Sequence, residues 1–209
     1  VIDRIYNTLK VEAYRESCNL AVERGAFPHF DWEVEKENAF IKSLPEEIRE
    51  MIKKNGRRNI SILTNAPTGS VSIMSQTSSG LEPVFRNFYT RRRKISHNDT
   101  KTKVDFVDDV GDKWQEYNVY HHKFGDWINK TDPWWKMQDD PEDLKLAVEA
   151  SPYAGATANE INWRNKVNMQ AAAQKWVCHA ISNTTNVPSD IEVDTVKEIY
   201  FSGWKLGCK

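Results

Sequence analysis

The spacing of apolar residues changes at one point in this 209-residue chain, and this change is the strongest limit on its fold. Over residues 1–24, apolar side chains recur at steps of three and four positions, which predicts a helix that ends at Gly25. Residues 59–64 are instead a short apolar run, partly β-branched and free of Gly and Pro, which predicts a strand. Strands that alternate with long helices favour the α/β class.

Further elements are expected on both sides of this strand. A second helix should begin with Asp31 as its cap and continue to about Leu44, and a third should begin at Pro45, a residue favoured at helix starts. The remaining elements are a strand and two helices, expected over residues 88–95, 159–181 and from about 189 to 206. We expect residues 59–64 to be buried in a sheet, with the helices near 1–24, 160–181 and 190–206 packed on one side of it.

Composition and charge exclude several classes of protein. Hydrophobic residues make up 39% and charged residues 28% of the chain, which is typical of a globular protein rather than a disordered one. The formal net charge of -1 gives no overall attraction to nucleic acid or anionic membranes, and no apolar run approaches the length of a membrane span. We therefore expect neither nucleic acid nor a membrane as a partner. The chain begins at Val1, without Met, and ends at Lys209, which suggests a piece of a longer protein.

Cysteine and histidine usage argues against disulfides and metal sites. The three cysteines, Cys18, Cys178 and Cys208, form no C-x-x-C pair and no cluster with histidines at zinc spacing. This pattern indicates a cytoplasmic location and predicts no metal site. Cys18 and Cys178 fall on apolar helical stripes, so we interpret both as core residues rather than reactive thiols.

A run of four cations, Arg91-Arg92-Arg93-Lys94, lies within the second expected strand. A short run without a wider basic face is typical of a solvated strand edge. Nucleic-acid binding through this run is the weaker alternative, and it would show as salt-dependent affinity for DNA.

The segment from Thr64 to Ser72 is the strongest candidate site. A loop of Pro, Thr, Gly and Ser after a strand presents several backbone N–H groups and hydroxyls to one point, which suits a phosphate or another anion. The alternative is a turn that only connects two elements. The loop contains no G-x-x-x-x-G-K sequence, so it is not a Walker P-loop. We expect a β-branched residue in place of Gly69 to disturb the backbone path.

The motifs around this loop occur in a recognisable order. Pro67-Thr68-Gly69-Ser70 follows the apolar run, and Ser78-Ser79-Gly80 and Glu82-Pro83-Val84-Phe85 come next. This order resembles the segment "P-T-G-(S/T), then S-S-G-(I/L)-E-P-x-F" of ribonucleotide reductase catalytic subunits, most nearly the adenosylcobalamin-dependent class. Three later segments are similar to further motifs of that family: Met169-Gln170-Ala171-Ala172, Ile181 to Pro188, and Ile199 to Lys209.

The resemblance implies that the chain is the C-terminal part of the ten-stranded α/β barrel in which ribonucleotides are reduced to 2′-deoxyribonucleotides by radical chemistry. In that family the loop binds the substrate's phosphates, so the implied site residues are Pro67, Thr68, Gly69, Ser70, Val71 and Ser72. The implied partners are a ribonucleotide and the remainder of the reductase. The implied cofactor of the complete enzyme is adenosylcobalamin, which we do not expect this chain to bind alone.

The sequence also departs from the family pattern. Val71 stands where some relatives have a hydroxyl residue, so only its backbone can donate, and Asn183 stands where many relatives have Lys. The family's Asn-x-Cys-x-Glu loop, whose cysteine becomes the thiyl radical, is absent from these 209 residues. We therefore assign no catalytic residue and predict that the chain alone is inactive. The alternative is a non-catalytic nucleotide-binding or interaction module that retains the reductase fold.

The resemblance is weakest over residues 96–157, which are polar and rich in aromatic residues. We expect a single α/β domain over residues 1–209, a partial barrel with this stretch as an excursion from it. Its tryptophans, Trp114, Trp127, Trp134 and Trp135, are interpreted as core or interface anchors.

Overall fold

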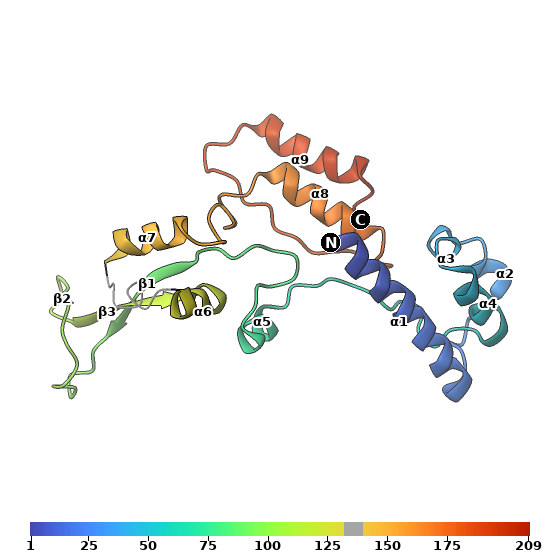
Figure 1. Cartoon of the computed structure of the whole chain (residues 1–209), viewed down its shortest axis with the longest axis horizontal. Helices are drawn as coiled ribbons and strands as arrows, with labels where there is room; N and C mark the ends of the chain where they lie inside the picture. The colour runs from blue at the N-terminus through green and yellow to red at the C-terminus, as the bar shows by residue number, and fades with distance from the viewer. Residues whose placement is uncertain (132–139) are drawn as a thin grey trace. The chain divides into compact units, whose positions relative to one another are not determined.

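A computed structural model describes residues 1–131 and 140–209 of the chain, and Figure 1 shows its helices and strands. The chain divides into two compact units. The first unit comprises residues 1–67 and 162–209, and the second unit comprises residues 68–161. Each unit is described by itself.

The first unit is built from helices. They are α1 (Ile2–Arg24), α2 (Trp32–Glu35), α3 (Ala39–Lys42), α4 (Glu46–Asn55), α8 (Trp163–Gln174) and α9 (Val193–Lys205). Helix α1 packs against α4 and α8, and α8 packs against α9. The core between α1, α3 and α4 is apolar and consists of Tyr14, Cys18, Ile41, Leu44, Ile48 and Ile52.

Among its described residues, 68–131 and 140–161, the second unit contains a small antiparallel sheet and three helices. Its elements are α5 (Gly69–Ser75), β1 (Phe88–Lys94), β2 (Phe106–Val107), β3 (Lys113–Tyr120), α6 (His122–Thr131) and α7 (Pro141–Glu149). The strand order is β1-β3-β2, with Phe88 opposite Tyr120 and Phe106 opposite Trp114. A core of Phe124, Ile128 and Ala147 joins α6 to α7.

Several predicted element boundaries are confirmed. Helix α1 ends at Gly25, whose φ of 79° is a conformation that favours glycine. The Asp31 side chain accepts a hydrogen bond from Glu33 N–H at the start of α2, and α4 begins directly after Pro45. The strand expected over residues 88–95 is β1.

Other boundaries were wrong. The helix expected from Asp31 to Leu44 is two short helices, because Asn38 makes a second cap by accepting a hydrogen bond from Phe40 N–H. The helix expected over 159–181 is limited to α8, which begins where Asn162 caps Arg164 N–H and ends at Gln174. Cys178 therefore lies beyond the helix and not on its apolar stripe. The last helix begins at Val193 rather than near Ser189.

The buried strand predicted over residues 59–64 is also wrong. In the part of the chain that the structure describes, these residues are extended but form no strand, and only Ile62 and Leu63 are partly buried. A single parallel bridge joins Asn65 to Ile181, flanked by hydrogen bonds from His179 N–H to Leu63 O and from Ser182 N–H to Asn65 O. A strand requires continuous pairing with a neighbour. The shared sheet expected beside the helices is reduced to this bridge.

The stretch 96–157 lies within the second unit and includes β2, β3, α6 and α7. Trp114 stacks against Phe106 and donates its indole N–H to Asp108, while Trp127 stacks against Phe124. Both tryptophans thus anchor local packing, as predicted. Trp134 and Trp135 lie outside the described residues. No helix among the described residues is long and apolar enough to cross a membrane.

Candidate functional site

The predicted phosphate loop is closed by a pair of hydrogen bonds with the turn that follows α5. Thr68 N–H donates to Ser79 Oγ at 3.0 Å, and Gly80 N–H donates to Thr68 Oγ1 at 3.1 Å. Thr68 Oγ1 accepts in the second bond, so its own O–H proton is still available to a ligand. The motifs Thr68-Gly69-Ser70 and Ser78-Ser79-Gly80, separate in sequence, are therefore one structural feature.

The first turn of α5 presents backbone donors. The first hydrogen bond of the helix joins Ser72 N–H to Thr68 O at 2.7 Å, so the N–H groups of Gly69, Ser70 and Val71 precede the helical ladder. The Thr68 side chain does not cap this end. Gly69, Ser70 and Val71 are all exposed. These three N–H groups and the hydroxyls of Thr68 and Ser70 are the donors that an anion could use.

Two predicted site residues have roles inside the helix. Ser72 is buried, and its hydroxyl donates to Gly69 O at 2.7 Å, so both its N–H and its O–H are used within α5. A Cβ added at Gly69 would meet nothing within 4 Å. A Cβ at Gly69 therefore meets no steric obstacle, and the effect of the further branches of a β-branched residue stays a prediction. Gly69 instead leaves open space beside the exposed donors.

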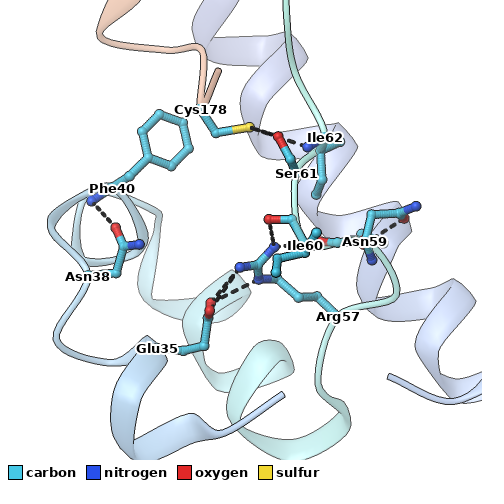
Figure 2. Close-up of polar contacts among 10 residues, drawn as sticks. Glu35, Asn38, Phe40, Arg57, Asn59, Ile60, Ser61, Ile62 and Cys178 are labelled. Carbon is cyan, nitrogen blue, oxygen red and sulfur yellow. Dashed lines mark hydrogen bonds and ion pairs between the residues drawn. The ribbon is translucent and has the colours of Figure 1, made fainter. Parts of the chain in front are cut away.

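A buried ion pair fixes the segment that leads toward the loop. The Arg57 guanidinium donates two hydrogen bonds to Glu35, each 2.9 Å long, and two more to the carbonyl oxygens of Asn59 and Ile60, at 2.5 and 2.7 Å (Figure 2). The Arg57 side chain is only 4% exposed. This arginine was not predicted from the sequence, because its role depends on a carboxylate 22 residues earlier in the chain.

The same segment surrounds the Cys178 sulfur with donors. The N–H group of Ile62 donates to it at 3.3 Å, and the Ser61 hydroxyl lies 3.7 Å away (Figure 2). The N–H group of Leu63 also donates to it, at 3.2 Å. The Tyr14 hydroxyl also lowers the pKa of this thiol. Burial by itself raises the pKa of the Cys178 thiol, but these donors outweigh it and bring the pKa below its ordinary value. Cys178 is therefore a partly buried residue among polar groups, rather than the core residue on a helical stripe that the sequence predicted.

A buried amine lies in the same region. Lys10 is 1% exposed, donates to Ser43 Oγ at 2.5 Å, and has its Nζ 3.9 Å from the centre of the Phe40 ring. Burial lowers the pKa of Lys10 to about 8, and the charge of Cys178 acts in the opposite direction. Burial likewise raises the pKa of the Tyr14 hydroxyl.

Asn183, at the position where many relatives have Lys, is held inside the first unit. Its Nδ2 donates to Gln170 Oε1 at 3.2 Å, while its buried Oδ1 has no hydrogen-bond partner among the described residues. Gln170 and Asn183 belong to two of the motifs that carried the family resemblance. Their contact explains how the substituted loop is held to α8 without a lysine.

Two of the four cations on β1 are paired with carboxylates within the sheet. Arg92 pairs with Glu116 at 2.7 Å, Lys94 pairs with Asp112, and Arg93 donates to Gln115 at 2.8 Å. β1 is at the edge of the sheet and these cations are exposed, as expected for a solvated strand edge. The described residues include no group of three His, Cys, Asp or Glu side chains placed to hold a metal ion.

The chain matches one known protein family over its whole length. The model of the ribonucleotide reductase barrel domain matches residues 1–209, so this chain belongs to that family. The resemblance drawn from the motifs is thereby confirmed.

Its relatives are named as vitamin B12-dependent enzymes. The chain is 30% identical over 206 residues to the vitamin B12-dependent ribonucleoside-diphosphate reductase of Mycobacterium tuberculosis, and 26% identical over 210 residues to that of Thermoplasma acidophilum. Each comparison covers 99% of this chain but only 26% and 23% of the relative. The chain therefore spans about a quarter of the length of the relatives it matches.

Two hollows among the described residues measure about 530 Å³ and 450 Å³. Hollows of this size suit drug-sized molecules, whereas a corrinoid with its nucleotide tail is much larger, so neither hollow fits adenosylcobalamin.

Proposed function

We propose that this chain contributes part of the barrel wall and the substrate-phosphate-binding loop of a ribonucleotide reductase, which converts ribonucleotides to 2′-deoxyribonucleotides by radical chemistry. The loop comprises Pro67, Thr68, Gly69, Ser70, Val71 and Ser72. The remainder of the reductase supplies the catalytic residues, and adenosylcobalamin is the cofactor of the complete enzyme. That cofactor generates the radical when bound, and the residues of this chain bind and orient the substrate.

One observation carries the phosphate assignment. The N–H groups of Gly69, Ser70 and Val71 are exposed at a helix start whose Thr68 side chain does not cap it. Their partial positive charges favour a dianionic group, and the hydroxyls of Thr68 and Ser70 add two neutral donors. Ser72 contributes by closing the first helical bond, which fixes the direction of the preceding N–H groups.

The loop contains no cation, so its attraction for an anion comes from dipoles. Charge-assisted hydrogen bonds to phosphate are stronger than neutral ones, but each N–H must first lose its water. Binding by this chain alone should therefore be weak. The Thr68–Ser79–Gly80 hydrogen bonds hold the donors in place before the ligand arrives, which reduces the entropy cost of binding.

Amide chemical shifts measured during titration with a nucleoside diphosphate test this proposal. We expect saturable shifts over residues 64–74, largest at Gly69, Ser70 and Val71. Ser70→Ala should weaken binding and leave the fold unchanged, whereas Ser75→Ala, at the other end of α5, is the matched control. If the chemical shifts of these amides do not change while those of another region do, the phosphate assignment is wrong.

Activity measurements test whether the remainder of the reductase supplies the catalytic residues. The purified chain, supplied with adenosylcobalamin and a dithiol, should reduce no ribonucleotide, because its sequence has no Asn-x-Cys-x-Glu loop. Turnover by the chain alone would contradict the proposal. Nucleotide binding without any contribution to a reconstituted reductase would favour the alternative of a non-catalytic nucleotide-binding module.

A further inference from the structure

A small hollow in the second unit, beside the turn that follows α5, has polar groups at an otherwise mostly apolar lining. It measures about 260 Å³ and is lined by Thr77, Ser78, Val84, Phe85, Arg86, Tyr89 and His121. A water molecule has a share of about 30 Å³ in the liquid, so the hollow can hold a small oxyanion with several waters. The residues Pro67 to Ser72 do not line it.

His121 lines this hollow. Its Nε2 is buried and has no hydrogen-bond partner among the described residues. The residue is fixed in place, because His121 N–H donates to Asn87 O at 2.8 Å and His121 O accepts from Gly125 N–H at 2.9 Å. A buried polar atom without a partner destabilises the fold, so this nitrogen favours a ligand that can form a hydrogen bond with it.

The charges around the imidazole are positive. Arg86 lines the hollow and is exposed, and the neighbours His122 and Lys123 occupy the first turn of α6. The start of this ten-residue helix adds the positive end of its dipole. Burial first, and then His122 and Lys123, lower the pKa of His121. The surroundings thus disfavour a second cation and favour an anion.

The hydroxyls at the hollow complete a set of donors. Thr77 Oγ1 lies 3.0 Å from Ser75 Oγ, and Ser78 is exposed at the same turn. Guanidinium, hydroxyl and imidazole N–H groups are the donors that proteins use for phosphate.

We propose that Thr77, Ser78, Arg86 and His121 form a second oxyanion site, which binds a phosphate group separately from the loop at Pro67 to Ser72. Arg86 supplies the charge, and His121 Nε2–H and the hydroxyls supply directed hydrogen bonds. The phosphate is either free or part of a nucleotide. This site goes beyond the proposed function, because it does not require the substrate to bind at α5.

The test follows the imidazole nitrogens of the ¹⁵N-labelled 209-residue chain by NMR, with inorganic phosphate as the probe and chloride at equal ionic strength as the reference. Phosphate should shift His121 Nε2 saturably and raise the pH at which His121 titrates, since a bound anion favours the imidazolium. A rise of one pKa unit corresponds to roughly tenfold tighter binding to the protonated form. His29, in the first unit, should not respond.

Variants separate the site from general charge effects. Arg86→Gln should weaken phosphate binding at His121 about tenfold, whereas Arg91→Gln, an exposed arginine on β1 that does not line the hollow, should leave it unchanged. His121→Asn should abolish the response, and an unchanged amide spectrum elsewhere would show that this variant is folded. If phosphate leaves His121 unchanged in the folded wild-type chain, the site does not exist.

The two phosphate sources and the two sites are distinguished in the same experiment. Equal affinity for phosphate and a nucleoside monophosphate would show that the phosphate group alone is recognised, whereas tighter nucleotide binding would add contacts with Phe85 or Tyr89. In the Arg86→Gln variant, the amides of Gly69 and Ser70 should still respond to a nucleoside diphosphate. If the loop at Pro67 to Ser72 binds no phosphate, His121 should still respond to phosphate. If His121 does not respond, the amides of Gly69 and Ser70 should still respond to a nucleoside diphosphate.

Discussion

The guanidinium of Arg57 holds the carboxylate of Glu35 through two hydrogen bonds, each 2.9 Å long, inside the first unit. The same guanidinium binds the carbonyl oxygens of Asn59 and Ile60. A backbone segment that is not paired in a sheet therefore has its polar groups satisfied by a side chain. This contact fixes the start of the extended run that leads to Asn65.

Removing one partner of this ion pair should be costly. Glu35→Gln should lower the free energy of unfolding by roughly 3–5 kcal/mol, because it leaves the Arg57 charge buried and uncompensated. The measurement is urea unfolding followed by circular dichroism. Glu33→Gln, which breaks an exposed pair with Lys36, is the control and should cost less than about 1 kcal/mol. Similar losses in the two variants would show that the Arg57 pair has no special role.

Substitution by alanine should change the stability of the chain strongly at Gly56 and very little at Gly69. A Cβ at Gly56 would lie 2.6 Å from the Ala26 Cβ, and its φ of 72° already strains other residues, so Gly56→Ala should destabilise the chain by about 1–3 kcal/mol. Gly69→Ala meets nothing within 4 Å and should change stability by less than about 0.5 kcal/mol. Thermal unfolding measures both. A large loss at Gly69 would contradict the open space described beside α5.

The features that the sequence predicted correctly are local in origin. A glycine after a helix, a proline before one, and an aspartate that caps one act within a turn of the chain, so Gly25, Asp31 and Pro45 were informative. The Asn38 cap was also present in the sequence. It was missed because the apolar spacing from Trp32 to Leu44 continues through it.

The features that were mispredicted depend on distant partners. Residues 59–64 have the composition of a strand, but a strand exists only where a neighbour pairs with it, and the described residues provide one bridge. The same holds for the candidate site. The sequence indicated the Thr68 loop, yet the Ser79 and Gly80 hydrogen bonds that close it, and the donors around Cys178, became visible only in three dimensions.

The buried amine of Lys10 should make stability depend on pH. Its pKa in the folded chain is about 8, below its ordinary value, so the unfolded chain binds the proton more tightly. The stability that goes with the neutral Lys10 amine is therefore fully present above the pKa of the unfolded chain, and it is lost as the pH falls through about 8. The Lys10→Met variant lacks this dependence. The difference in unfolding free energy between Lys10→Met and wild type should change between pH 7 and pH 10, in the direction that favours wild type at high pH. A constant difference over this range would show that Lys10 is well solvated.

Cys178 should be the most reactive thiol of the three. Its donors lower its pKa, whereas burial raises the pKa of Cys18 to about 11 and also raises that of Cys208. The thiolate is the nucleophile, so at neutral pH iodoacetamide should alkylate Cys178 before the other two, with iodide as the leaving group. Peptide mass spectrometry after timed quenching measures each rate.

The origin of this reactivity can be separated from simple exposure. Tyr14→Phe removes a hydroxyl that lowers the pKa of Cys178, so the pH midpoint of Cys178 alkylation should rise. Tyr6→Phe, which removes a hydrogen bond to Asn65, should leave this midpoint unchanged. Because the folded pKa is depressed, the thiolate stabilises the fold above the unfolded pKa, and this contribution disappears as the pH falls through the folded pKa. Cys178→Ser should therefore lose more stability, relative to wild type, at pH 9 than at pH 6. Equal alkylation rates for Cys178 and Cys208 across this range would show that the Ile62 and Leu63 N–H groups do not stabilise a thiolate.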